Sequence, residues 1–165
     1  NLKQMAAALQ YLKEHQLFEY DDLVAKTDAA TERFHTLAGD IQQTEAELSR
    51  VSDLMAAVVQ YAKTRPAFDG YKAAKYSRKY LAEHEAELAD YRAVKATMAE
   101  LLGGEKLPKM DVLKEKRRQL AARKKALYLE YRKAQQDMRE LVAVKGSVDH
   151  LRGLTDNQRN KEQAR

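Results

Sequence analysis

Hydrophobic residues recur every seven residues between Tyr20 and Ala62. One set of positions reads Tyr20, Thr27, Phe34, Ile41, Leu48, Met55 and Ala62. A second set, offset by three residues, reads Leu23, Ala30, Leu37, Thr44, Val51 and Val58. This regular alternation of three- and four-residue steps predicts a long helix over 20–64 that packs along one face, here called the seam, as in a left-handed coiled coil.

A second long helix is predicted over 108–150. Its seam reads Leu113, Arg117, Leu120, Lys124, Leu127, Tyr131, Ala134, Met138, Leu141, Lys145 and Val148. The two seams match when the helices run antiparallel and the numbers of paired residues sum to 171 or 172. This pairing sets Leu113 opposite Val58 and Phe34 opposite Met138, and it sets large side chains beside small ones, as dense packing requires.

Shorter helices are expected at both ends of this pair. At the base (1–19), a helix from Leu2 to His15 carries Leu2, Met5, Leu9 and Leu12 on one face. At the tip (66–107), one helix is predicted from Ser77, as N-cap, to Leu102, with Gly103-Gly104 as C-cap. Pro66 is expected to end or kink the first long helix, because proline lacks the N–H that a helix needs. Residues 154–165 are expected to form a frayed polar tail.

The predicted fold class is therefore all-α: an elongated antiparallel coiled coil of two long helices, with shorter helices packed at the tip and the base, in a single domain over 1–165. Composition supports this class. Charged residues make up 33% of the chain, and it has only two prolines and six glycines to interrupt helices. There is no cysteine, which is compatible with a reducing compartment.

The sequence offers no arrangement that we interpret as catalytic, metal-binding or cofactor-binding. Glu32-x-x-His35 matches one arm of a carboxylate di-iron site, but both residues fall outside the seam and no second arm is present. Gly103-Gly104 before Lys106 lacks the spacing of a phosphate-binding loop, so a helix cap is the better interpretation. Glu83, Glu85 and Glu87 are read as a solvated face. We therefore expect no enzyme activity, no metal and no cofactor.

Charge is distributed in blocks, and the basic blocks suggest a site. Residues 61–80 hold six Lys or Arg and one acid, and residues 106–133 hold eleven against three. The antiparallel arrangement would bring both blocks to the tip, where the cations could neutralise phosphates and tyrosines could stack on bases. The predicted nucleic-acid-binding residues are Lys63, Arg65, Lys72, Lys75, Tyr76, Arg78, Lys79, Lys109, Lys114, Arg117 and Arg118. The alternative is that Tyr61, Tyr71 and Tyr80 pack the tip while the bases are merely solvated.

Several short segments resemble the C-terminal helical region of mobilisation relaxases from Gram-positive conjugative and integrative elements. They are Tyr61-Ala-Lys-Thr-Arg65, Tyr76-Ser-x-Lys79-Tyr80, Glu83-His84, Leu107-Pro108-Lys109, Glu130-Tyr131-Arg132 and Met138-Arg139-Glu140-Leu141. Relaxases nick one DNA strand through a tyrosine assisted by a metal in a histidine cluster. Since neither the histidine cluster nor the sequence context of a nucleophilic tyrosine occurs here, the resemblance implies that catalysis belongs to an upstream domain. Pro66 departs from the pattern, which usually has helix-compatible residues there.

These observations lead to a functional expectation with alternatives. The first is a non-enzymatic accessory domain of a relaxase-like protein that binds DNA near the transfer origin through its basic tip. The second is an adaptor whose helices dock a coupling or accessory mobilisation protein, or dimerise the relaxase. The third is a structural spacer. The absence of a long apolar run favours no membrane partner, and we expect a bacterial cytoplasmic protein.

Overall fold

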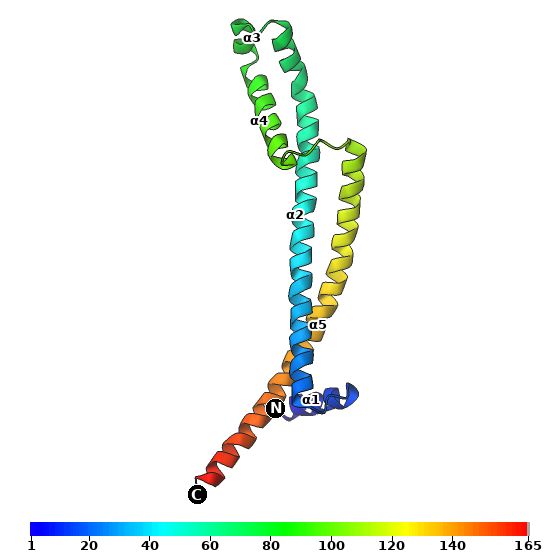
Figure 1. Ribbon diagram of the computed structural model, residues 1–165, viewed down its shortest axis with the longest axis vertical. Coiled ribbons are helices and arrows are strands. Elements are labelled where there is room, and N and C mark those ends of the chain that lie inside the picture. Colours follow the sequence, from blue (N-terminus) through cyan, green and yellow to red (C-terminus); the bar gives the residue numbers. More distant parts are fainter. Residues whose placement is uncertain (165) are drawn as a thin grey trace. The chain divides into compact units, whose positions relative to one another are not determined.

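The computed structural model describes residues 1–164. In this range it contains α-helices and no strand: α1 (Leu2–Glu14), α2 (Tyr20–Ala73), α3 (Arg78–Glu83), α4 (Glu85–Leu102) and α5 (Met110–Gln163) (Figure 1). The all-α prediction is confirmed. The packing falls into two compact units, one of residues 42–124 and one of residues 1–41 with the chain from Lys125 onward. Both long helices run through both units, and the single domain stays a prediction.

The predicted seam is the packed face of both long helices. On α2 every seam position from Tyr20 to Val58 is buried or half-buried, and only Ala62 is exposed. On α5 only Arg117 of the predicted seam is exposed. In each unit the two helices run antiparallel (Figure 1). The heptad pattern therefore located the packed face correctly, while the supercoil itself stays a prediction.

The pairing along the seam differs from the expectation at Phe34 and, as described below, at Leu113. Phe34 stacks on Tyr131, with 4.9 Å between ring centroids, whereas the sequence pattern set it opposite Met138. Tyr131 lies one heptad earlier on α5, so the same face is used at a different height. Two stacked aromatic rings attract each other beyond the apolar area that they bury, and a pattern of apolar positions does not include this preference.

In the unit of residues 1–41 and 125 onward, α1 packs on the long helices through small and aromatic residues. Ala8 is buried together with Leu23, Leu141 and Val144. Tyr11, Leu12 and Leu17 pack around this core. After α1, Gln16 has φ 55° and the Leu17 N–H donates to the Leu12 carbonyl at 2.9 Å, which is a Schellman turn with its hydrophobic contact.

The face predicted for α1 was partly wrong. Leu12 is half-buried as expected, but Leu2 is 86% exposed and Leu9 is 60% exposed. The helix packs instead through Ala8, whose small side chain lets the α1 backbone come close to its neighbours. A pattern of large apolar residues does not count alanine as a contact, so it predicted the wrong packed face for α1.

A polar contact joins the ends of the long helices in the same unit. The Tyr20 hydroxyl donates to Asp149 Oδ1 at 2.5 Å, and Lys145 Nζ donates to Asp149 Oδ2 at 2.7 Å. The Arg152 guanidinium lies 3.6 Å from the centroid of the Tyr20 ring. The hydrogen bonds from Lys145 and then from Tyr20 lower the pKa of Asp149 below its ordinary value of 3.8.

Acid is expected to weaken this contact. Because the pKa of Asp149 is lower in the folded chain, its contribution to stability is present above about pH 4 and is lost as the pH falls through the folded pKa. We expect Asp149→Asn to melt at a lower temperature than the native chain near about pH 6, and both to melt together near about pH 2, as measured by circular dichroism. The exposed Asp156→Asn is the control. Equal melting temperatures for the Asp149 variant and the native chain at the higher pH would contradict the prediction.

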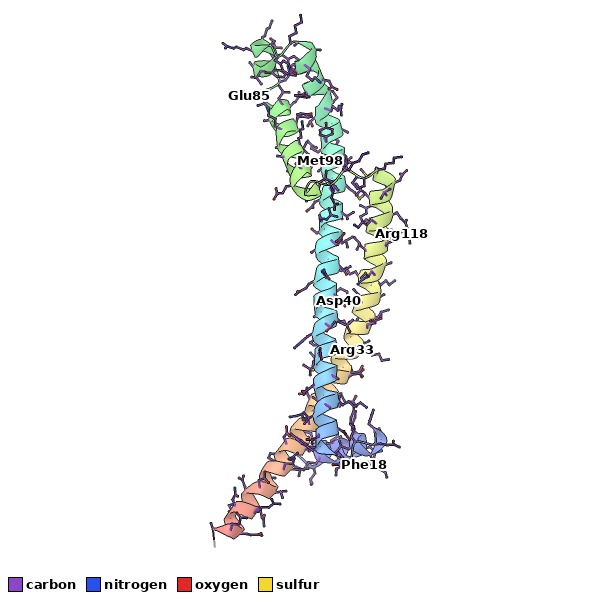
Figure 2. The ribbon with its side chains drawn as sticks, in the orientation of Figure 1. Phe18, Arg33, Asp40, Glu85, Met98 and Arg118 are labelled. Carbon is purple, nitrogen blue, oxygen red and sulfur yellow. The ribbon has the colours of Figure 1, made fainter. Side chains whose placement is uncertain are left out.

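The unit of residues 42–124 is built on the second half of α2. Val51, Leu54 and Met55 bury Leu113 of α5, and Leu101 and Leu102 at the end of α4 pack on the same cluster. Farther along α2, Ala57 is buried with Val94 and Met98 of α4. Tyr91 stacks on Tyr61 and on Phe68. Figure 2 shows Met98 on the α4 segment that lies against α2.

Ion pairs between the long helices flank this core. Lys116 Nζ lies 2.8 Å from Glu47 Oε1, and Lys124 Nζ lies 3.5 Å from Glu45 Oε1. The hydrogen bond from Lys116 lowers the pKa of Glu47. These pairs are partly exposed, so they fix the antiparallel pairing more than they add stability.

Helix α2 does not end at Pro66 but continues to Ala73. Proline in a helix interior costs about 3 kcal/mol, since one hydrogen bond is lost and the ring clashes with the preceding turn. Here the residues around Pro66 are packed: Thr64 and Ala67 are buried, and Phe68 stacks on Tyr91 at 4.4 Å. This packing against α4 offsets the local cost, which the sequence pattern could not include.

Two other element boundaries differ from the expectation. The single helix predicted over 77–102 is divided into α3 and α4 at His84, whose φ of −122° lies outside the helical range. The Ser77 N-cap and the Gly103 C-cap are confirmed, the latter with φ 57°. Helix α5 continues to Gln163 where a frayed tail was predicted, and residues 154–164 are all exposed. The tail contains no proline or glycine after Gly153, so nothing in its backbone stops the helix.

Candidate nucleic-acid interface

The turn between α2 and α3 has a defined backbone. The Tyr76 N–H donates to the Tyr71 carbonyl at 3.0 Å and the Lys75 N–H to the Lys72 carbonyl at 3.0 Å, which is the hydrogen-bond pattern of a Schellman turn. Lys75 (φ 54°) and Tyr76 (φ 60°) both occupy the left-handed region, at a cost of about 1 kcal/mol each. The Tyr76 ring packs edge-on against Tyr71 at 5.2 Å, and the hydroxyl of Ser77 then caps α3.

Tyr80 holds this turn against α2. Its hydroxyl donates to the Ala67 carbonyl at 2.8 Å, and its ring stacks on His84 with 4.0 Å between centroids. The ring lies over Gly70, where an added Cβ would come within 2.2 Å of the Tyr80 hydroxyl oxygen. Tyr80 and Tyr71 are thus half-buried parts of the packing, as the alternative interpretation proposed. Tyr76 is 57% exposed and remains available to a ligand.

The cations of this turn form the first cluster. We name Lys72, Lys75, Arg78 and Lys79 the turn cluster; all four side chains are exposed. Lys72 Nζ lies 5.9 Å from the centroid of the Phe68 ring. Within residues 1–164, none of the four forms an ion pair with a carboxylate. The cluster therefore presents uncompensated positive charge at one ordered turn.

Lys63 and Arg65 do not belong to this cluster. Arg65 Nε lies 3.7 Å from Asp69 Oδ2, and its Nη1 lies 3.4 Å from the Tyr61 hydroxyl. Lys63 is exposed, but nine residues separate it from Lys72, and at 100° per residue these two side chains leave opposite faces of α2. The structure therefore separates Lys63 from the other residues predicted for the site.

The cations at the start of α5 form a second cluster. We name Lys109, Lys114, Arg117 and Arg118 the α5 cluster; all four are exposed. Arg118 makes two hydrogen bonds to Glu115, at 2.6 and 3.0 Å, which lower the pKa of Glu115 and raise that of Arg118. Figure 2 shows Arg118 on the first half of α5. Its charge is thus partly compensated, whereas the other three cations have no ion-pair partner in the described chain.

The prediction of one contiguous basic tip was wrong. Leu113 packs against Val51, Leu54 and Met55, and α4 returns along α2 beyond that point (Figure 1). Lys72 lies 17 residues past Met55, which is about 25 Å along a helix. The two clusters are therefore separate, because α5 begins to pack on α2 nearer the N-terminus of α2 than the seam pattern indicated. Binding of nucleic acid by either cluster stays a prediction.

Two residues near the clusters were missed in the sequence. Gly70 makes room for the Tyr80 ring, and its signal is a glycine inside a strongly helical segment. Asp69 is the one acid among the bases of 61–80 and pairs with Arg65.

Glu32 and His35, considered for a metal, are both exposed. Over the described chain no group of three or more potential metal ligands was found.

A search for helices long and apolar enough to cross a membrane found none in residues 1–164. Comparison with known proteins adds no identification: no family model, no curated protein and no solved structure matches this chain.

Proposed function

We propose that this chain is a non-enzymatic DNA-binding module whose turn cluster holds the phosphate backbone. One observation carries the proposal: four exposed cations, unpaired with any carboxylate among the described residues, are gathered at the α2–α3 turn. Exposed surface cations usually have acids interspersed among them. A run of cations without acids is the pattern that nucleic-acid-binding surfaces use.

The ordered packing of the turn, in addition to its charge, supports DNA binding. The paired backbone hydrogen bonds, the Tyr80–Ala67 bond and the Tyr71–Tyr76 contact order the backbone that carries the cations. An ordered backbone loses less conformational entropy when a ligand binds than a free loop does. Only the long side chains of the cluster then remain to be ordered on the phosphates.

The resemblance to relaxase C-terminal regions gives this proposal its context. In such a protein the module would hold DNA near the transfer origin while a separate domain supplies the nicking chemistry. The module would then act by position, since it keeps the strand close to a nuclease without taking part in the reaction.

An adaptor function is the second candidate, and one observation favours it. Leu2 and Leu9 of α1 are largely exposed, and Phe18, in the link between α1 and α2, is 76% exposed (Figure 2). Large apolar side chains left open to solvent occur on surfaces that bind another protein. In this case a coupling or accessory mobilisation protein, or a second copy, would bind through α1.

The experiment that tests DNA binding is a charge reversal in the turn cluster. The native chain should bind a fluorescent DNA duplex, and with four phosphate contacts log affinity should fall with log salt at a slope of about −3 to −4. Lys72→Glu, Lys75→Glu, Arg78→Glu and Lys79→Glu combined should abolish this binding while circular dichroism still shows the native helix content. The matched control reverses four exposed cations far from the turn along the sequence: Lys26, Lys133, Arg139 and Arg159.

The control variant has the same net charge as the test variant, so a loss of binding in both would mean attraction by overall charge and not by the turn. No salt-dependent binding by the native chain would contradict the proposal. Binding to vesicles of anionic lipid but not to DNA would identify a membrane surface as the ligand instead. If DNA affinity survives the turn-cluster reversal, the adaptor function is favoured, and Leu2→Ser with Leu9→Ser should then weaken association with the partner.

A further inference from the structure

One face of α2 is left uncovered beyond the point where α5 begins. The seam continues at heptad spacing past Val58 to Ala62, Arg65, Asp69 and Lys72, and each of these four residues is exposed. Helix α5 starts at Met110 and packs Leu113 against Val51, Leu54 and Met55, so it does not reach this part of the face. Helix α4 packs on a different face, through Ala57, Tyr61 and Phe68.

This open face connects the two clusters. At one end of this face is Lys109, whose carbonyl accepts the Leu113 N–H. It precedes Leu113 by four residues and so lies about 6 Å nearer the C-terminal end of α2. At the other end of the face is Lys72. Arg65 lies between Lys109 and Lys72, seven residues or about 10 Å before Lys72 on α2. Cations thus occur at intervals along a surface that nothing in the described chain occupies.

We propose that one nucleic acid lies along this face and is held by the turn cluster and the α5 cluster together. The inference rests on the proposed DNA-binding function and adds a second attachment point and a minimum ligand length. From Arg118 to Lys72 the two clusters together span about 35 Å along the long helices. A duplex rises about 3.4 Å per base pair, so a segment of about 10–12 base pairs spans both.

Joining two attachment points changes the dependence of affinity on ligand length. A duplex too short to span both clusters binds one at a time, and added length raises affinity only by offering more positions. A duplex that spans both makes the second attachment intramolecular, which strengthens binding by a factor set by the effective concentration. A step in affinity at the spanning length is therefore the signature of joint binding.

Asp69 provides an independent test of the path along α2. Its carboxylate lies on the open face and pairs with Arg65, so it opposes a phosphate there and competes for the one cation between the clusters. Asp69→Asn removes the negative charge with little change in size. It should raise affinity for a spanning duplex about two- to fivefold, the range expected for one exposed charge pair, and raise the affinity for a short duplex by less.

The experiment measures affinity for hairpin-closed duplexes from about 5 to about 20 base pairs at fixed salt. The native chain should show a rise of about 10- to 100-fold near 10–12 base pairs and little change beyond. Reversing Lys109, Lys114 and Arg117 to Glu should remove the step and lower the affinity for the shortest duplex by no more than about twofold, because the turn cluster still binds it. The control reversal of Lys26, Lys133 and Arg139 should keep the step.

A smooth increase with length, or a step that survives the α5-cluster reversal, would overturn joint binding while leaving the turn cluster as the DNA site. An equal effect of the α5-cluster reversal at every length would overturn it too, because both clusters would then touch the same short segment. Failure of the proposed function looks different: the native chain would bind no duplex of any length in a salt-dependent way.

Discussion

Leu54→Ala is expected to lower the free energy of unfolding by about 2–5 kcal/mol. The Leu54 side chain is 1% exposed and lies in the cluster of Val51, Met55 and Leu113, on which the end of α4 also packs. Removing it takes apolar surface out of the core and leaves a cavity walled by three different helices. Such a site cannot collapse by moving one element, so most of the cavity remains and the cost is near the upper part of the range.

Urea unfolding followed by circular dichroism measures this change. Leu129→Ala is the matched control, because Leu129 is 62% exposed and the same truncation there leaves no cavity. We expect a change below about 0.5 kcal/mol for the control. A loss under about 1 kcal/mol for Leu54→Ala would show that α4 and α5 do not meet on α2 at this residue.

Gly70→Ala is expected to destabilise the α2–α3 turn although alanine is the better helix former. The added Cβ would lie 2.2 Å from the hydroxyl oxygen of Tyr80 and 2.9 Å from its Cζ. The ring must therefore move, which breaks its hydrogen bond to the Ala67 carbonyl and its stacking on His84. Crowding of this kind costs about 1–3 kcal/mol, more than the gain of about 1 kcal/mol from helix propensity.

The same substitution should change sign when the ring is absent. In a Tyr80→Ala background nothing crowds the new methyl group, so Gly70→Ala should stabilise the chain by up to about 1 kcal/mol. Amide hydrogen exchange at Ala73 and Ala74 measures the effect locally, and Gly39→Ala is the control because no atom lies within 4 Å of its added Cβ. Destabilisation that persists in the Tyr80→Ala background would mean that Gly70 is needed for its backbone and not for its missing side chain.

The helices and their packed faces could largely be predicted from the sequence. The seam from Tyr20 to Val58, the Ser77 cap and the Gly103 cap all lie where local rules place them. These features depend on residues close together in the chain: a heptad repeat defines one face, a serine hydroxyl accepts a nearby N–H, and glycine adopts positive φ without strain.

The candidate site could be predicted only in its residue types. The sequence marked the cations of 61–80 and 106–118, but it joined them into one tip and included Lys63. The error came from the position along α2 at which α5 begins to pack. Leu113, which packs among Val51, Leu54 and Met55, sets this position. Where a helix meets its partner depends on the fit of many side chains, and heptad spacing permits several pairings that differ by one or two turns.

The sequence alone determined that this chain is helical, where most of its helices begin, and which face of each long helix packs. Tertiary structure decided the rest. It carried α2 through Pro66, because the packing of Thr64, Ala67 and Phe68 offsets the lost hydrogen bond. It also half-buried Tyr71 and Tyr80, left Tyr76 and the turn cluster exposed, and opened the face of α2 beyond the start of α5. Local propensities act over a few residues, whereas these outcomes depend on contacts between segments distant in sequence, which only the folded chain brings together.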